Sequence, residues 1–159
     1  YLYFTGIRPD ELKRLSSREA ELVNLKTAVV TLPAEVAKGR FPRQVDIPPN
    51  MLRWLQVAPG PIKPKNFDRL YRRVRNHFKL GKDEARKSFI SFHVALHRSL
   101  GDASLQAGNS ESVIRQHYLN VHPKEEGRAF FRITPCLKTR RAVCSQNLLQ
   151  DADPILKAI

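Results

Sequence analysis

The sequence predicts an α+β domain that is mainly helical and has a small three-stranded antiparallel sheet. Apolar residues recur at helical spacing in the stretches 10–25, 67–78, 83–98 and 111–119. The β-branched run 28–32 favours a strand, and the segments 36–40 and 43–47, around a turn with glycine and proline, add two more. A chain of 159 residues is long enough for one domain with its own core.

The N-terminal third alternates between breakers and periodic segments. Residues 1–4 are apolar and have no cap, as at the end of a helix whose beginning is absent, so we expect a domain cut from a larger protein. Gly6 breaks this helix, and Pro9 suits the first turn of the next one, predicted over 10–25. The strand 28–32 and the hairpin 36–47 follow.

The rest of the chain reads as helices separated by short loops. Asn50 and Asn66 are candidate N-caps for helices over 51–57 and 67–78. Gly108 closes a short helix over 103–107, and Ser110 caps the helix 111–119. A last short helix covers 124–131. Beyond residue 133 the apolar pattern weakens, so we divide the chain into a domain, 1–133, and a tail, 134–159.

The charge of the chain is strongly positive. It has 28 Lys and Arg against 15 Asp and Glu, a net charge of +13. Such a surplus attracts polyanions such as nucleic acids, although a basic protein without a specific partner is the alternative. No apolar run reaches the length of a membrane span, and no signal-peptide layout is present. Cys136 and Cys144 lie in the tail and form neither a zinc motif nor a disulfide framework, which favours a reducing cytosol.

Three segments carry residue types suited to phosphate chemistry. The first spans 5–12 and contains Arg8, and the second is 34–38, ending in Lys38 and followed by 45–48. The third begins at Arg86, passes Asn109 after 23 positions and reaches Tyr118 after another 9. An arginine binds two phosphate oxygens with its fork, and a tyrosine hydroxyl can attack phosphorus.

These segments, in this order over residues 1–132, resemble the catalytic half of the tyrosine recombinases, the phage-integrase family. The resemblance implies an enzyme of site-specific DNA recombination or integration that acts on double-stranded DNA as a homotetramer, without cofactor or metal. It also implies a cytoplasmic protein of a bacterial mobile element, associated with the nucleoid when on DNA. The family's preceding helix and DNA-clamping domain are absent from the sequence, so we expect the chain alone to bind DNA poorly.

The resemblance assigns roles residue by residue. Tyr118 would attack a phosphodiester, Arg8 and Arg86 would stabilise the phosphoryl oxygens, and Lys38 would protonate the leaving 5′ oxygen. Asp83 stands where the family has a histidine that assists proton movement. Asn109 replaces a histidine or tryptophan that donates to the phosphate. We therefore expect a weakened enzyme.

Further basic residues are candidates for DNA contact: Arg40, Arg43, Arg72, Arg73, Lys87 and Arg115. Each prediction has a structural alternative. Arg8 could pair with Glu11, and Lys38 could simply be solvated. Arg86 could pair with Asp83 or Glu84. Tyr118 lies on an apolar stripe, as a core tyrosine would, and His93 and His97 read as core and rim residues.

Two other functions remain open at this point. A degenerate family member would bind DNA without cutting it, and a basic helical scaffold would share only the structure. The tail, 134–159, could pack on a neighbouring subunit or be disordered.

Overall fold

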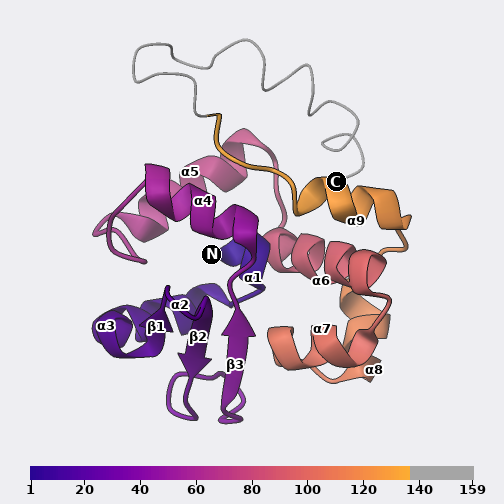
Figure 1. Ribbon diagram of the computed structural model, residues 1–159, viewed down its shortest axis with the longest axis horizontal. Helices are drawn as coiled ribbons and strands as arrows, with labels where there is room; N and C mark the ends of the chain where they lie inside the picture. The colour runs from indigo at the N-terminus through magenta and orange to yellow at the C-terminus, as the bar shows by residue number, and fades with distance from the viewer. Residues whose placement is uncertain (137–159) are drawn as a thin grey trace.

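The computed structural model describes residues 1–136 and is mainly helical, with a three-stranded antiparallel sheet, which confirms the predicted fold class (Figure 1). The strands β1 (Val23–Asn24), β2 (Val29–Leu32) and β3 (Arg43–Asp46) lie in the order β1-β2-β3. Val30 faces Val23 on one side and Val45 on the other, which fixes the register of the sheet. The predicted tail lies outside the described residues from 137 onward.

The predicted strand over 36–40 is wrong, because this segment forms a turn. The backbone N–H groups of Val36 and Ala37 both donate to the carbonyl of Pro33, at 2.9 and 3.0 Å. The next N–H, that of Lys38, donates to the Glu11 carboxylate instead of to a strand. The third strand of the sheet is β1, which the prediction had placed in a helix.

The helix predicted over 10–25 is divided into shorter pieces. It consists of α2 (Pro9–Leu15), the 3₁₀ turn η1 (Ser16–Arg18) and α3 (Glu19–Leu22). The hydroxyls of Ser16 and Ser17 donate to the carbonyls three positions earlier, a local bond that competes with the helical pattern. The interruption turns the chain so that β1 reaches β2.

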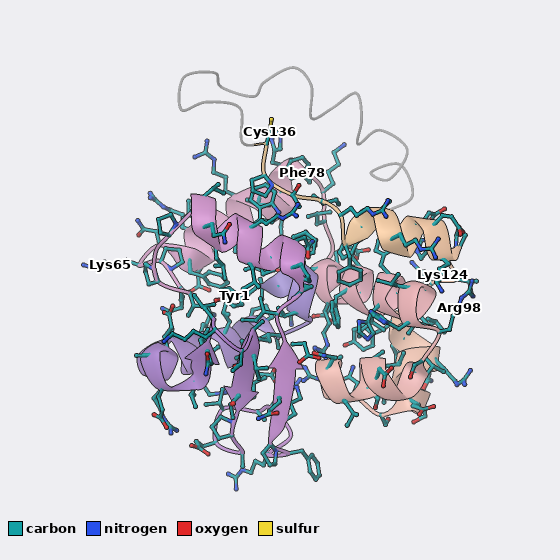
Figure 2. All side chains as sticks on the ribbon, viewed as in Figure 1. Tyr1, Lys65, Phe78, Arg98, Lys124 and Cys136 are labelled. Carbon is teal, nitrogen blue, oxygen red and sulfur yellow. The ribbon has the colours of Figure 1, made fainter. Side chains whose placement is uncertain are left out.

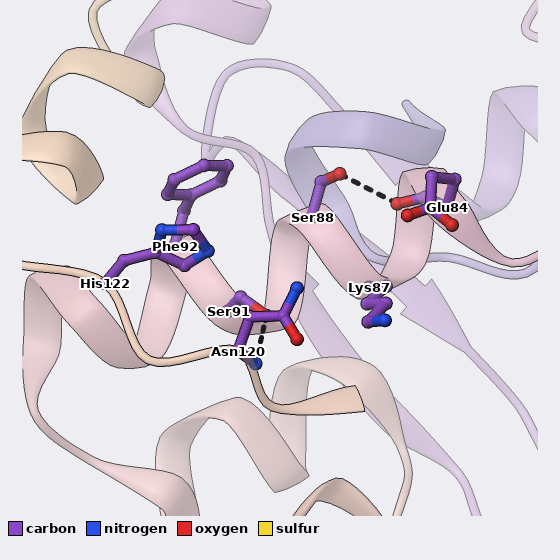
Figure 3. A pocket seen from close by; sticks show the side chains of 7 residues that line it. All are labelled: Glu84, Lys87, Ser88, Ser91, Phe92, Asn120 and His122. Carbon is purple, nitrogen blue, oxygen red and sulfur yellow. Dashed lines mark hydrogen bonds between the residues drawn. The ribbon is translucent and has the colours of Figure 1, made fainter. Parts of the chain in front are cut away.

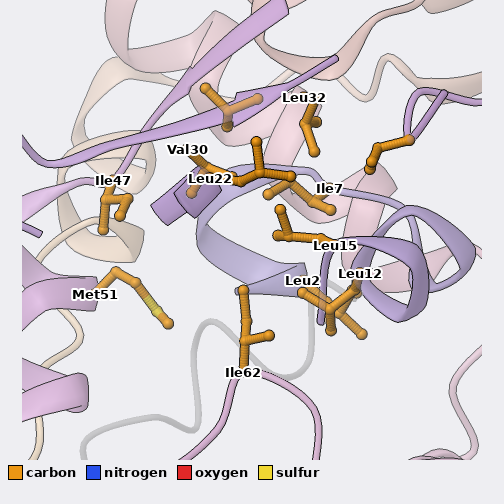
Figure 4. Packing of buried hydrophobic residues seen from close by; sticks show 13 residues of the cluster. Leu2, Ile7, Leu12, Leu15, Leu22, Val30, Leu32, Ile47, Met51 and Ile62 are labelled. Carbon is orange, nitrogen blue, oxygen red and sulfur yellow. The ribbon is translucent and has the colours of Figure 1, made fainter. Parts of the chain in front are cut away.

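A first hydrophobic cluster joins the sheet to the N-terminal helices (Figure 4). It includes residues of α1 (Leu2–Thr5) and α4 (Pro49–Val57) as well as α2, α3 and the strands. Its buried members include Leu2, Ile7, Leu12, Leu15, Leu22, Val30, Leu32, Val45, Ile47 and Met51. Non-directional apolar burial of this kind is the main stabilising contribution to the fold.

The two predicted N-caps, Asn50 and Asn66, make no capping hydrogen bond with their side chains. Asn50 lies inside α4 and not at its N-cap, and its side-chain amide donates to the carbonyl of Ile133 at 3.3 Å. Asn66 is the N-cap residue of α5 (Phe67–His77), but its side chain makes no capping bond. Helix α5 therefore begins at the predicted residue, but the predicted capping hydrogen bond is not formed.

Helix α5 is more exposed than its apolar stripe predicts. None of its residues is buried, and Leu70, Val74 and the following Phe78 are 44%, 44% and 52% exposed. Figure 2 shows Phe78 on the outside of the molecule, near Cys136 in that view. Only Phe67 and Tyr71 pack against the first cluster, so the inward stripe is narrower than predicted.

The helix predicted over 83–98 is confirmed as α6 (Glu84–His97), around which the C-terminal half is built. It packs against α7 (Leu100–Ala107), the π-helical turn η2 (Ile114–Tyr118) and α9 (Lys124–Phe130), and a second cluster includes Phe89, Ile90 and Ile114. The helix predicted over 111–119 is regular only in α8 (Glu111–Val113) before it widens into η2. In the described part of the chain no helix is both long and apolar enough to cross a membrane.

Both predicted caps in this half are confirmed. Gly108 has a left-handed conformation, with φ 65°, at the end of α7. The Ser110 hydroxyl accepts from the backbone N–H of Val113 at the start of α8. The two residues on either side of Asn109 therefore fix the loop that presents it.

Gly127 allows α9 to approach α6 closely, and its replacement by alanine is expected to destabilise the protein. An added Cβ would lie 2.8 Å from both the Phe92 oxygen and the Leu96 nitrogen, so one helix must shift. We expect a loss of about 1–3 kcal/mol in the free energy of unfolding, measured with urea. The control is Gly101→Ala in α7, where the nearest atom is 3.7 Å away and the helix gains propensity. Equal stability of both variants would contradict the prediction.

A buried arginine cluster as the candidate functional site

Three sequence-predicted residues from distant segments meet at one point. Arg8 is the N-cap residue of α2, Arg86 lies in the first turns of α6, and Asn109 follows α7. A terminal nitrogen of each guanidinium, Nη2, donates to the same atom, the Asn109 side-chain oxygen, with Arg86 at 2.9 Å. Arg8 also donates to the Gly108 carbonyl at 3.3 Å. The structure therefore brings Arg8, Arg86 and Asn109 together.

Arg86 is held by the C-terminal ends of two helices. Its side chain donates to the carbonyls of Gly6, which ends α1, and Ala107, which ends α7. The last carbonyls of a helix have no partner within it and carry the negative end of the dipole, so they suit a cation. Arg86 is only 4% exposed, and this burial, with the charges of Arg8 and Arg43, lowers its pKa to about 10. It does not pair with the acids at the start of α6.

Glu11 is a fully buried carboxylate that accepts hydrogen bonds from several residues of the cluster. It accepts from the backbone N–H groups of Arg8 and Lys38, both at 3.1 Å, and from the side chains of Arg8 and Arg43. Burial by itself raises the pKa of Glu11, but the hydrogen bonds and charge of Arg43 and the two backbone bonds outweigh it and hold the pKa at about 2. Glu11 is therefore ionised and fixes Arg8 in place.

Arg43 occupies a structural position. Its guanidinium donates to Glu11 at 2.8 and 3.2 Å and to the Gln106 carbonyl at 3.1 Å, and its side chain is 9% exposed. We predicted that Arg43 contacts DNA, but its donors are directed at protein acceptors. It instead ties β3 to α2 and α7.

The cluster contains more positively charged than negatively charged groups. Three guanidinium groups, of Arg8, Arg43 and Arg86, meet a single carboxylate, that of Glu11. The remaining partners within residues 1–136 are neutral carbonyl oxygens. Two positive charges are thus left for an anion, and Arg8, with 19% of its side chain exposed, gives the cluster an open side.

Tyr118 lies beside the cluster on η2. The Arg86 guanidinium carbon is 5.8 Å from the centre of its ring, and the side chain is half-buried. The Ser91 hydroxyl fixes the backbone here, because it donates to the Tyr118 carbonyl and accepts from the Asn120 N–H, each at 2.9 Å. The π turn and this serine together place the ring against Arg86.

A small polar pocket lies beneath the segment that follows Tyr118 (Figure 3). Its volume is about 10 Å³, room for about one water, and its lining includes Lys87, Ser91, Asn120 and His122. Lys87, predicted to contact DNA, is half-buried at this pocket and does not reach the arginine cluster by any hydrogen bond among the described residues.

The remaining sequence-predicted residues lie at the surface. Lys38 is exposed, and only its backbone N–H contacts the cluster, through Glu11. Asp83 is the exposed N-cap residue of α6, and its carboxylate makes no ion pair within the described chain. Four exposed arginines are placed on turns and helices without a hydrogen bond to the cluster: Arg40, Arg72, Arg73 and Arg115.

Sequence reasoning missed the residues that hold the site together. Gln106 accepts from Arg43 with its backbone carbonyl, and Ser91 donates to the Tyr118 carbonyl. Ser104 donates to the Asn109 carbonyl, and Arg43 pairs with Glu11. None of these contacts leaves a periodic or spacing signal in the sequence. Residues 1–136 contain no group of His, Cys, Asp and Glu side chains that could hold a metal ion.

Comparison with known proteins gives no assignment. We found no match to the chain among the models of protein families, the curated proteins or the solved structures.

Proposed function

We propose that this chain is the catalytic domain of a tyrosine recombinase, which cleaves and rejoins DNA strands through a phosphotyrosyl intermediate on Tyr118. One observation carries the proposal: Arg8 and Arg86 converge on a site with two unneutralised positive charges, beside a tyrosine ring. A phosphodiester is a compact anion with two free oxygens, and the bidentate donors of arginine match it. The order of the sequence segments supports the same class.

The chemistry follows from the roles of the side chains. The Tyr118 oxygen attacks phosphorus, gives its proton to solvent water and forms a 3′-phosphotyrosyl bond, while the bond from phosphorus to the 5′ oxygen breaks. Lys38, on an exposed turn, has a flexible stem that can bring its proton to the leaving oxygen. Arg8 and Arg86 stabilise the charge that builds on the free oxygens. Attack by a 5′ hydroxyl on the phosphotyrosine reverses the step and rejoins the strand.

The substituted positions reduce the rate in this proposal. Asn109 supplies an uncharged amide where the resemblance expects a histidine or tryptophan, and Asp83 has a carboxyl group where it expects a histidine. Loss of one donor to the phosphoryl group typically lowers the rate by about 10²–10³. The partners proposed are double-stranded DNA and further copies of the chain in a tetramer, with Arg40, Arg72, Arg73 and Arg115 as exposed cations for the DNA backbone.

A trap for the covalent intermediate tests the proposal. The protein is incubated with a pool of nicked duplexes of randomised sequence. After cleavage, the short fragment that carries the new 5′ hydroxyl diffuses away, so the strand is not rejoined. The covalent protein–DNA adducts are then counted on denaturing gels. We expect an adduct that Tyr118→Phe abolishes. The matched control is Tyr71→Phe, because Tyr71 is also half-buried and also has an arginine carbon 5.8 Å from its ring centre. An adduct that survives Tyr118→Phe would refute the assignment of the nucleophile.

A binding protein without cleavage activity is the second candidate, and one contact favours it. The Asn109 oxygen already occupies donors of both arginines. In this case the wild type would bind DNA in an electrophoretic mobility-shift assay, and its affinity for DNA would fall as the salt concentration rises. It would form no covalent adduct with the DNA. An adduct that appears only in Asn109→His would then identify an intact scaffold with a lost donor.

A further inference from the structure

The Asn109 amide has only one orientation compatible with its neighbours. Guanidinium groups donate hydrogen bonds and accept none, so the atom that lies between the Nη2 atoms of Arg8 and Arg86 must be the carbonyl oxygen. The amide nitrogen, which is the only donor of this side chain, therefore faces away from both arginines. In this state Asn109 cannot donate to an anion that the arginines bind.

The loop around Asn109 is held firmly, so only the side chain is free to turn. Its backbone carbonyl accepts from the Ser104 hydroxyl, Gly108 before it closes α7, and Ser110 after it caps α8. The Asn109 side chain is neither fully buried nor fully exposed, and no hydrogen bond of its nitrogen is present within residues 1–136. Rotation of the amide thus breaks the two bonds to arginine and no other side-chain bond.

We infer that Asn109 is a built-in cap on the arginine pair: its carbonyl oxygen occupies the place of a phosphoryl oxygen, and a phosphodiester must displace it. This inference rests on the proposed function and adds a regulation of the same site. The incoming oxygen takes over the Nη2 protons of Arg8 and Arg86. The released amide then turns, so that its nitrogen donates to the bound phosphate.

Electrostatics explains why the cap yields to a phosphate. The amide oxygen is neutral and leaves the two excess charges of the cluster in place, whereas a phosphodiester carries a full negative charge. Hydrogen bonds between ionised partners are about twice as strong as those with a neutral partner. The cap therefore excludes weak, neutral acceptors such as carbonyl groups, and a phosphodiester displaces it.

The test measures the binding of dimethyl phosphate, the simplest phosphodiester, to the protein and its variants. The probe signal is the NMR resonance of the Arg86 Nε–H, which is buried and has no hydrogen-bond partner in the described structure. Asn109→Ala removes the two bonds by which the cap competes with the phosphate and also the one bond that the turned amide donates to it. The net gain is about one charge-assisted hydrogen bond, so this variant is expected to bind about tenfold more tightly. Asn109→Asp substitutes a charged cap and is expected to lose binding. Asn76→Ala, on the exposed face of α5, is the matched control and is expected to bind like the wild type.

The outcomes separate the cap from the proposed function. Tighter binding by Asn109→Ala together with loss in Asn109→Asp supports the cap. Weaker binding by Asn109→Ala than by the wild type overturns it and makes Asn109 a simple ligand, with the phosphate site intact. No shift of the Arg86 signal in any protein overturns both the cap and the phosphate site. If Asn109→Ala does not fold, Asn109→Leu takes its place, because leucine fills a similar volume but neither accepts nor donates a hydrogen bond, and the same two outcomes apply.

Discussion

Glu11→Gln is expected to lower the free energy of unfolding by about 3–5 kcal/mol, because it leaves buried guanidinium groups without their carboxylate. Glu11 is fully buried, and the Arg43 side chain that pairs with it is 9% exposed. Glutamine keeps the size of the side chain but offers one acceptor oxygen in place of two. Urea unfolding at pH 7 measures the loss.

The control for this prediction is Glu21→Gln. Glu21 also pairs with an arginine, Arg18, at 2.5 Å, but both side chains are exposed. An exposed pair of this kind contributes about 0–1 kcal/mol. Our reading of the cluster would be wrong if Glu11→Gln destabilised the protein no more than Glu21→Gln.

Acid is expected to destabilise the protein through His93, by about 3 kcal/mol between pH 7 and pH 4. Burial, with a smaller contribution from the charge of His97, lowers the pKa of His93 from 6.5 to about 4. Between these values the unfolded chain binds a proton that the folded protein does not. The stability is therefore complete above pH 6.5 and is lost as the pH falls toward 4.

The measurement compares the wild type with His93→Phe at both pH values. Phenylalanine suits the site, because the His93 ring already lies 5.1 Å from the Phe89 ring and 6.3 Å from that of Phe131. A pH dependence as steep in His93→Phe as in the wild type would assign the effect to other groups.

Where the sequence carries periodic or capping information, the fold follows from it. The helix α6 has a continuous apolar side, and Gly108 and Ser110 mark helix ends by their own chemistry. The strand over 36–40 was mispredicted because the backbone of Lys38 bonds to Glu11, 27 positions earlier. A local pattern cannot reveal such a bond. The π turn that ends at Tyr118 also involves a distant partner, because its last carbonyl accepts from the hydroxyl of Ser91, 27 positions earlier.

The site was predictable only in part. The resemblance to the tyrosine recombinases predicted that Arg8, Arg86 and Asn109 share a phosphate, and the three side chains do meet. The partnership of Arg43 with Glu11 was not foreseen, because a surface arginine near a hairpin and a buried one look alike in sequence. Burial is decided by tertiary packing, which places α7 over β3 and leaves α5 exposed.

The bond between Arg8 and Asn109 has a consequence for how the protein is made. It joins residues 101 positions apart, so the cluster needs nearly the whole described chain before it can form. During synthesis Arg8 leaves the ribosome early, and its acceptor follows only several seconds later, at about 5–20 residues per second. Closing a loop of this length costs conformational entropy before the contact compensates for it, so such contacts form slowly. The nascent chain therefore exposes an Arg8 that is paired only with Glu11 while its N-terminal core assembles, and the anion site is completed last.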